Sequence, residues 1–263
     1  MKSSMLAVPV RKVTRTGSAH EQDLLAVEEP LQIRLGERDI AITMRTPGHD
    51  DELAVGFLFS EGILRSATGI TNLATGDNAV TITGPPNDGD LAERHFYMTS
   101  SCGICGKASV DALSASGCTT LDMDGFQLPG ALLETLPTRL REAQKVFEHT
   151  GGLHGAALFN DQGELICVRE DVGRHNAVDK LIGRAVLDHR VPLSRYGLLL
   201  SGRISFELVQ KALMAGIPMV CAVGAPSSLA VETALRFGIT LAGFVRDGRF
   251  NIYSTPERIH FSK

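Results

Sequence analysis

The sequence predicts a two-domain α/β protein whose larger, C-terminal domain is built on a mainly parallel sheet. Its 263 residues exceed what one small domain needs, and 43% of them are hydrophobic. Glycine is abundant at 27 residues and aromatic residues make up only 5%, which favours tight strand-to-helix turns over an aromatic-rich all-β sandwich. After residue 150, strand-like and helix-like segments alternate, as they do in βαβ units.

The N-terminal part of the chain predicts a small α+β domain over 21–128, preceded by a flexible N-terminus at 1–20, where the residues are polar. Alternating apolar and polar residues around Gly36 predict a β-hairpin, and Asp50 is the expected N-cap of the next helix. In chain order we expect the hairpin at 31–35 and 39–44, that helix at 51–60, short strands at 79–83 and 95–99, and a second helix at 107–115.

The C-terminal part predicts a larger α/β domain over 129–263. It opens with a helical stretch at 131–149, bent or restarted at Pro137. Six strands follow, the first two joined by a turn, at 154–159, 164–169, 197–201, 217–223, 240–246 and 249–253. Helices are predicted between them at 175–188, 205–215 and 227–237. This alternation predicts a mainly parallel sheet covered on both faces.

Three strand-to-helix junctions carry unusual residues, at 170–176, 201–205 and 223–228. The carboxyl ends of parallel strands line a common crevice, and helix N-termini there favour anions. Arg174 and Arg203 add donors suited to phosphate, and His175 and Ser201 are further candidates. Each junction alone is more simply a helix cap with a solvated charge. Together they favour a phosphate- or nucleotide-bearing ligand, although neither a P-loop nor a dinucleotide fingerprint is present.

The chain contains one Cys-x-x-Cys, in Ser-Cys-Gly-Ile-Cys-Gly-Lys at 101–107. A structural zinc site needs four ligands, and no second pair of this kind exists to supply them. A redox dithiol is feasible, because a helix N-terminus can lower a thiol pKa. A sulfur carrier is also feasible, because one thiol of the pair could hold a persulfide and the second could help to release the sulfur. Spacing alone does not separate these two hypotheses.

Bulk properties weigh against several classes of partner. The net charge of −4 and the absence of Trp do not favour nucleic acid or an acidic membrane. We expect no secretory signal and no membrane span, because the apolar runs are shorter than the roughly 18–20 residues that a span requires. The expected location is therefore the cytoplasm, where thiols stay reduced. Cys167 and Cys221 lie in apolar strands and are expected to be buried and inert.

Several segments together resemble the FdhD/NarQ family, the formate dehydrogenase accessory sulfurtransferases. They are Ser-Cys-Gly-Ile-Cys-Gly at 101–106, Glu-Asp-Val-Gly-Arg-His-Asn-Ala-Val-Asp-Lys at 170–180 and Ser-Gly-Arg-Ile-Ser-Phe-Glu-Leu-Val-Gln-Lys at 201–211. Shorter matches include Phe-Leu-Phe-Ser-Glu-Gly at 57–62, and the resemblance runs from about residue 25 to the end.

The resemblance implies an activity and a set of site residues. Members accept persulfide sulfur from a cysteine desulfurase and pass it to the molybdenum (or tungsten) bis-pterin guanine dinucleotide cofactor of formate dehydrogenase. The persulfide forms on the residue equivalent to Cys102, with Cys105 assisting. The cofactor is a bound substrate, mimicked by a GDP-like guanine nucleotide, and the protein itself holds no metal. The implied cofactor-binding segment is Phe244, Val245, Arg246, Asp247, Gly248 and Arg249.

The resemblance also implies a homodimer and a C-terminal domain with the three-layer α/β/α fold of cytidine deaminases, without their zinc. The phosphate-binding crevice predicted from Arg174 and Arg203 suits the nucleotide end of such a cofactor. Two alternatives remain open at this point. One is a thiol-disulfide oxidoreductase. The other is a non-catalytic cofactor-binding chaperone whose cysteines only grip the pterin or the metal.

Overall fold

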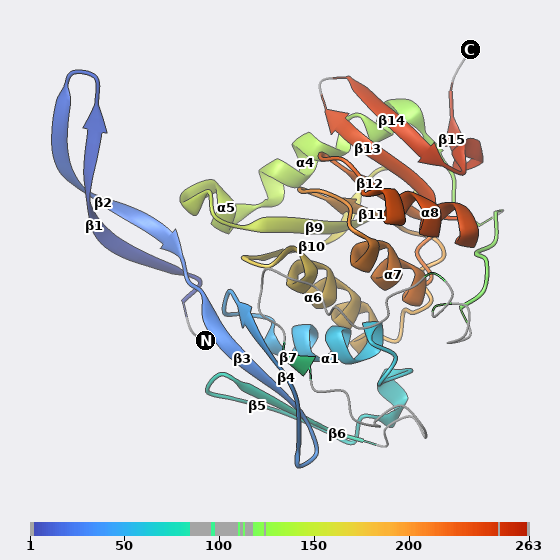
Figure 1. Ribbon diagram of the computed structural model, residues 1–263, viewed down its shortest axis with the longest axis horizontal. Coiled ribbons are helices and arrows are strands. Elements are labelled where there is room, and N and C mark those ends of the chain that lie inside the picture. The colour runs from blue at the N-terminus through green and yellow to red at the C-terminus, as the bar shows by residue number, and fades with distance from the viewer. Residues whose placement is uncertain are drawn as a thin grey trace.

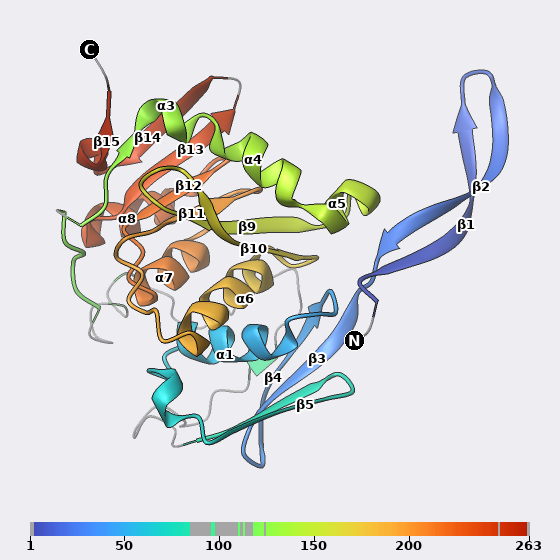
Figure 2. The same ribbon diagram turned by 180° about the vertical axis from the view of Figure 1, so that it is seen from behind.

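The computed structural model describes residues 3–84, 96–97, 110, 113, 118–123, 125–246 and 248–261. It is a mixed α/β structure with two larger sheets and a ribbon that projects from the N-terminal side (Figures 1 and 2). Within these residues, the first sheet has five strands in the order β5-β6-β3-β4-β7. They are β3 (Glu29–Leu35), β4 (Arg38–Arg45), β5 (Asn72–Gly76), β6 (Ala79–Thr83) and β7 (Phe96–Tyr97).

The second sheet has six strands among the described residues, in the order β10-β9-β11-β12-β13-β14. They are β9 (His154–Phe159), β10 (Leu165–Asp171), β11 (Gly197–Leu200), β12 (Met219–Ala222), β13 (Thr240–Arg246) and β14 (Arg249–Ser254). Only β11, β12 and β13 pair parallel. The expectation of a mainly parallel sheet was therefore wrong, because β9 is inserted antiparallel between β10 and β11 and β14 folds back on β13.

Helices cover both faces of this sheet. On one face lie α3 (Gly130–Leu133), α4 (Leu136–Ala143) and α5 (Lys145–Thr150), and on the other lie α6 (Arg174–Leu187), α7 (Phe206–Met214) and α8 (Ser228–Phe237) (Figures 1 and 2). Alternate strand residues enter two cores. Ala156 and Leu158 pack with α6–α8, whereas Ala157 and Phe159 pack with α3 and α4.

Helix α1 (Asp50–Ser60) lies between α6 and the five-stranded sheet, so one continuous core joins both halves of the chain. The two helices approach unusually closely. A Cβ on Gly56 would lie 1.8 Å from the Asp179 carbonyl oxygen, and one on Gly183 would lie 1.8 Å from that of Glu52. Only glycine fits at either position, because any side chain would push the helix backbones apart.

The N-terminus differs from its prediction. The expected flexible segment 1–20, together with the first residues of the expected small domain, forms β1 (Met5–Thr14) and β2 (Gly17–Ala26), an antiparallel ribbon in a sheet of its own. The hydrophobic pattern did not reveal it, because most of the ribbon is exposed and buries no continuous apolar face.

Other elements differ locally. The stretch at 131–149 forms α3, α4 and α5; the start of α4 at Leu136 agrees with the predicted restart at Pro137, whereas the second break, at Gln144, was not predicted. The residue before α1 is His49, in a left-handed conformation with no side-chain cap, while Asp50 binds Arg45 instead of capping. Two short helices and two short strands complete the described elements: η1 (Ala67–Gly69), η2 (Pro256–Arg258), β8 (Leu128–Pro129) and β15 (Ile259–His260). The helix predicted at 107–115 lies outside the described residues, except for Val110 and Leu113, which are buried.

Candidate functional site

The carboxyl ends of β10, β11, β12 and β13 share one edge of the six-stranded sheet. Strands β10 and β11 both pair antiparallel with β9 between them, so they run in the same direction. Strands β12 and β13 continue that direction in parallel pairing. The three predicted junctions and the β13–β14 turn therefore lie along one edge, which we call the site edge. Their predicted convergence is confirmed, although a ligand there stays a prediction.

Backbone hydrogen bonds join the second and third junctions. The Gly224 N–H donates to the Gly202 carbonyl at 3.0 Å, and the Ile204 N–H donates to the Ala225 carbonyl at 3.0 Å. A Cβ on Gly224 would lie 2.7 Å from the Gly202 carbonyl oxygen. Glycine is needed at this position because the two loops touch through their backbones.

His175 joins the first junction to the second. Its Nε2 lies 3.3 Å from the Ser205 hydroxyl and 3.9 Å from a Glu207 carboxylate oxygen. Burial, followed by the positive charges of Lys211 and Arg174, lowers the pKa of His175 to about 4. The imidazole is therefore neutral at pH 7 and acts as a hydrogen-bonding group, not as a cation for phosphate.

His154 lies at the same edge, at the start of β9 and beside Gly202. Burial and then the charge of Arg174 lower its pKa, against the opposing effect of Asp171. Ser201, a predicted binding residue, already uses its hydroxyl within the fold, where it accepts a hydrogen bond from the Gly155 N–H at 2.8 Å. It holds β9 against the end of β11.

The arginines of the site edge differ in exposure. Arg174 is half-buried, whereas Arg203, Arg246 and Arg249 are exposed. Arg246 stands over the Phe244 ring, 5.8 Å from its centroid. The edge thus presents a positive rim, which suits anionic groups such as phosphate.

The predicted 244–249 segment forms the turn from β13 to β14. Phe244 has a φ of +54°, a left-handed conformation that is uncommon for a bulky side chain. Its N–H donates to the Gly224 carbonyl at 3.0 Å, which ties this turn to the third junction. The Val245 side chain is fully buried in the core beneath α3 and α4, so only its backbone can meet a ligand. Asp247 lies outside the described residues.

Comparisons with known proteins place this arrangement in a family. The model of the FdhD/NarQ family matches residues 26–260. The chain belongs to the FdhD/NarQ family. The sulfur carrier protein FdhD of Streptomyces avermitilis is 53% identical over 251 residues, which cover 90% of this chain and 89% of that protein. The protein of the same name from Sulfurisphaera tokodaii is 44% identical over 257 residues, covering 96% and 98%.

A solved structure supports the fold across the same length. The crystal structure of a proposed formate dehydrogenase accessory protein from Desulfotalea psychrophila superposes with a TM-score of 0.81 at 26% identity. The match covers 98% of this chain and 100% of that one. The mixed α/β architecture described above is therefore shared with that protein.

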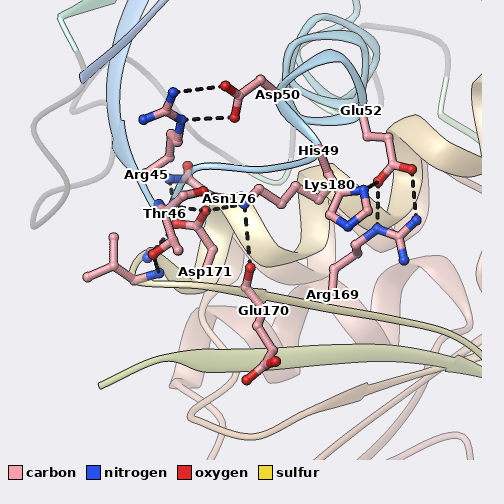
Figure 3. Close-up of polar contacts among 12 residues, drawn as sticks. Arg45, Thr46, His49, Asp50, Glu52, Arg169, Glu170, Asp171, Asn176 and Lys180 are labelled. Carbon is pink, nitrogen blue, oxygen red and sulfur yellow. Dashed lines mark hydrogen bonds and ion pairs between the residues drawn. The ribbon is translucent and has the colours of Figure 1, made fainter. Parts of the chain in front are cut away.

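The family motif at 170–180 has a second role that the sequence did not reveal. Asp171 and Lys180 form a fully buried ion pair at 2.7 Å. The Thr46 N–H donates to Asp171 at 3.1 Å, and Lys180 donates to the Thr46 carbonyl at 2.8 Å (Figure 3). Asn176 donates to the Met44 carbonyl at 2.7 Å. One face of this FdhD/NarQ motif thus fastens the site edge to the end of β4.

Two further sets of buried contacts, one through Glu52 and one through Ser60, join the halves of the chain. Arg169 on β10 binds Glu52 on α1 through two contacts of 2.5 and 2.7 Å (Figure 3). Burial alone would raise the pKa of Glu52, but hydrogen bonds from Arg169 and His49 outweigh it and lower the pKa to about 2. On the other side of α6, Asp179 accepts from Lys211 at 2.8 Å and from Ser60 at 3.0 Å.

The Cys102–Cys105 pair of the FdhD/NarQ motif lies outside the described residues, so its predicted role stays a prediction. Of the other thiols, Cys221 is fully buried and burial raises its pKa. Burial also raises the pKa of the half-buried Cys167. Both are poor nucleophiles, as expected. Among the residues that the structure describes, no cluster of three or more His, Cys, Asp or Glu side chains could hold a metal ion.

Proposed function

We propose that this chain is a sulfur carrier. It accepts persulfide sulfur from a cysteine desulfurase on Cys102 and delivers it to the molybdenum or tungsten bis-pterin guanine dinucleotide cofactor of formate dehydrogenase. The observation that carries the proposal is its near full-length similarity to proteins named sulfur carrier protein FdhD. The positive site edge supports it, because the cofactor carries phosphates that such an edge can bind.

The proposed loading step is a thiol exchange. The Cys102 thiolate attacks the outer sulfur of the desulfurase persulfide, a new sulfur–sulfur bond forms on Cys102, and the desulfurase thiolate leaves. No net oxidation occurs. For release, the Cys105 thiolate attacks the inner sulfur of the Cys102 persulfide, which forms a Cys102–Cys105 disulfide and frees the outer sulfur as sulfide. A reductant must then restore the dithiol.

Intact-mass measurement tests this role. Incubation with a desulfurase and cysteine should add the mass of one sulfur atom to the wild-type protein and none to Cys102→Ala. Cys105→Ala should load but release its sulfur slowly. Cys167→Ala is the matched control, because its thiol is half-buried with a raised pKa. Equal loading of Cys102→Ala and the wild type would end the proposal.

The same measurement separates the two alternative functions. A thiol-disulfide oxidoreductase would reduce insulin and cycle between dithiol and disulfide without acquiring sulfur from the desulfurase. A cofactor-binding chaperone would never load, and its Cys102→Ala variant would lose affinity for the cofactor. The reduced thiols needed for loading make the cytoplasm the proposed location. In the described part of the chain, no helix has the length and apolar character of a membrane span.

We propose that the nucleotide end of the cofactor lies against the site edge, with Arg174 and Arg203 on its phosphates. A cytidine deaminase-like layering belongs to the same proposal, supported by a six-stranded sheet with helices on both faces. Titration with GDP tests the placement. Arg203→Ala should weaken binding by about 10- to 100-fold, since a charge-assisted hydrogen bond contributes roughly 1.5–3 kcal/mol. Arg195→Ala is the control, because exposed Arg195 precedes the opposite end of β11. If Arg203→Ala and Arg195→Ala lose the same amount of GDP affinity, the nucleotide does not bind at the site edge.

A further inference from the structure

Three polar side chains, from His175, Ser205 and Glu207, form a row along the site edge between α6 and α7. His175 lies in the first turn of α6, while Ser205 and Glu207 lie at the start of α7. The His175 Nε2 is 3.3 Å from the Ser205 hydroxyl and 3.9 Å from a Glu207 carboxylate oxygen, and the same hydroxyl bonds the Glu207 carboxylate. The phosphate contacts proposed for Arg174 and Arg203 give this polar row no role.

The direction of these hydrogen bonds follows from the number of hydrogens that each group has. Burial alone would raise the pKa of Glu207, but hydrogen bonds from Ser205 and from its own backbone N–H outweigh it and lower that pKa. Glu207 is therefore a carboxylate at pH 7 and can only accept. Ser205 has one hydroxyl hydrogen and donates it to this carboxylate, so towards His175 its oxygen can only accept. The hydrogen in that contact therefore belongs to the His175 Nε2.

The second ring nitrogen of His175, Nδ1, is consequently a hydrogen-bond acceptor. The ring is neutral at pH 7, because burial and then the charges of Lys211 and Arg174 lower its pKa to about 4, against the opposing effect of Glu207. A neutral imidazole carries one hydrogen, which is on Nε2, so Nδ1 keeps a lone pair. Among the residues that the structure describes, none donates to Nδ1, and 23% of the side chain is exposed.

The side chain of Ser205 supports a role outside its own helix. Ser205 is the N-cap residue of α7, but its hydroxyl makes no capping hydrogen bond. Ser227 is the N-cap residue of α8, and its hydroxyl accepts from the Ala230 N–H at 3.3 Å, as an N-cap serine usually does. The two backbones are alike, with φ and ψ of −94° and 167° for Ser205 and −81° and 160° for Ser227. Ser205 thus bonds Glu207 and His175 in place of capping α7.

We propose that the His175 Nδ1 accepts a hydrogen bond from a neutral O–H or N–H of the bound nucleotide, and that Ser205 and Glu207 are positioning residues that hold the ring for this contact. An ionised phosphate is a poor partner for Nδ1, because both groups are acceptors. Ribose hydroxyls and the N–H groups of the base are donors. The inference rests on the proposed placement of a nucleotide at the site edge, and it adds that this edge selects a nucleoside phosphate over other phosphates.

Calorimetric titration of the full chain with GDP tests the contact without any sulfur donor. An asparagine side chain can place its oxygen near the position of Nδ1, whereas a glutamine side chain reaches the position of Nε2. His175→Asn should therefore keep most of the affinity for GDP. His175→Gln should bind GDP about 2- to 12-fold more weakly, the loss expected for one neutral hydrogen bond. The matched control is His189→Gln, which should bind like the wild type, because exposed His189 follows the other end of α6.

Two further arms of the titration test the positioning residue and locate the donor. Ser205→Ala should lose part of the GDP affinity, and Ser205→Thr, which keeps a hydroxyl, should restore it. Neither variant removes a helix cap, because Ser205 makes none. The 2′,3′-dideoxy analogue of GDP lacks the ribose hydroxyls. If His175→Gln and the wild type bind this analogue equally, ribose supplies the donor, and if the difference persists, the base supplies it.

Nitrogen NMR reads the ring directly and keeps the proposal falsifiable if a variant folds poorly. His175 of the free wild type should carry its hydrogen on Nε2, and the Nδ1 signal should shift when GDP binds. A hydrogen on Nδ1, or equal GDP affinity of His175→Gln and the wild type, would overturn the inference and leave the nucleotide at the site edge. A wild type that does not bind GDP would overturn the placement and the inference together. Sulfur loading on Cys102 is measured separately, so neither result decides it.

Discussion

The buried pair of Asp171 and Lys180 makes the sharpest stability prediction. Asp171 is fully buried, forms an ion pair with Lys180 at 2.7 Å, and accepts from the Thr46 N–H at 3.1 Å and from the Gly173 N–H at 2.8 Å. Asp171→Ala removes every one of these acceptors. The Lys180 ammonium, itself only 1% exposed, would keep the Thr46 carbonyl but lose its counter-charge. A buried charge without its partner strongly destabilises the folded state.

The free energy of unfolding of Asp171→Ala should fall by about 3–5 kcal/mol, the usual cost of removing one partner of a buried ion pair. At roughly 2 °C per kcal/mol for a chain of this size, Tm should fall by about 6–10 °C. Far-UV circular dichroism is the suitable probe, because the sequence contains no Trp. Asp171→Ala combined with Lys180→Met should recover part of the loss, since the double variant leaves no unpaired charge.

The matched control is Asp39→Ala. Asp39 forms an ion pair with Arg34 at 2.9 Å, nearly the same distance, but its side chain is 63% exposed. An exposed pair contributes only about 0–1 kcal/mol, so Tm should hardly change. If Asp171→Ala lowers Tm no more than Asp39→Ala does, burial of the pair does not hold the two halves of the chain together and the reasoning is wrong.

Three further outcomes are expected. Gly183→Ala should destabilise the protein by about 1–3 kcal/mol or more, because its Cβ would collide with the Glu52 carbonyl oxygen, whereas Gly76→Ala, with nothing nearer than 3.9 Å, should not. Glu52 has a pKa lowered to about 2, so the stability that its ionised carboxylate gives the folded state is complete above pH 4.5 and is lost as pH falls towards 2. The Tm of Glu52→Gln should therefore change less than that of the wild type across this pH range. His175 should titrate near pH 4 in an NMR experiment, and its contribution to stability should fall as pH drops from 6.5 towards 4; a midpoint near 6.5 would contradict the burial argument.

The site edge was predictable because it depends on local patterns. Strands at 154–159 and 240–246 have the predicted bounds, and α6, α7 and α8 begin at Arg174, Phe206 and Ser228, each one residue from its predicted start. Once each strand is followed by a helix and the strands run in one direction, their carboxyl ends must share an edge. The position of Arg174 and Arg203 at that edge could therefore be predicted without knowing the order of the strands in the sheet.

The order of the strands was not predictable in the same way. The turn at 161–163 indicated that β9 and β10 form a hairpin, but it carried no signal that β9 would also pair with β11. That second pairing depends on packing between distant segments, as does burial of Lys180. In the sequence, Lys180 is a charged residue in an ordinary helix, and only the approach of Thr46 and Asp171 shows why it is enclosed.

The single stretch at 170–180 both contributes to the site edge and joins the two halves of the chain. Arg174 and His175, in the first turn of α6, belong to the site edge, while Asn176 and Lys180 on the same helix are fixed to Met44 and Thr46. Hinge opening between the two sheets would break the hydrogen bonds of Asn176 and Lys180 to the Met44 and Thr46 carbonyls and separate the close contact of Gly56 with α6. The two halves are therefore fixed to each other along this contact. On the proposed function, sulfur would therefore have to reach the site edge without closure of one half of the chain on the other.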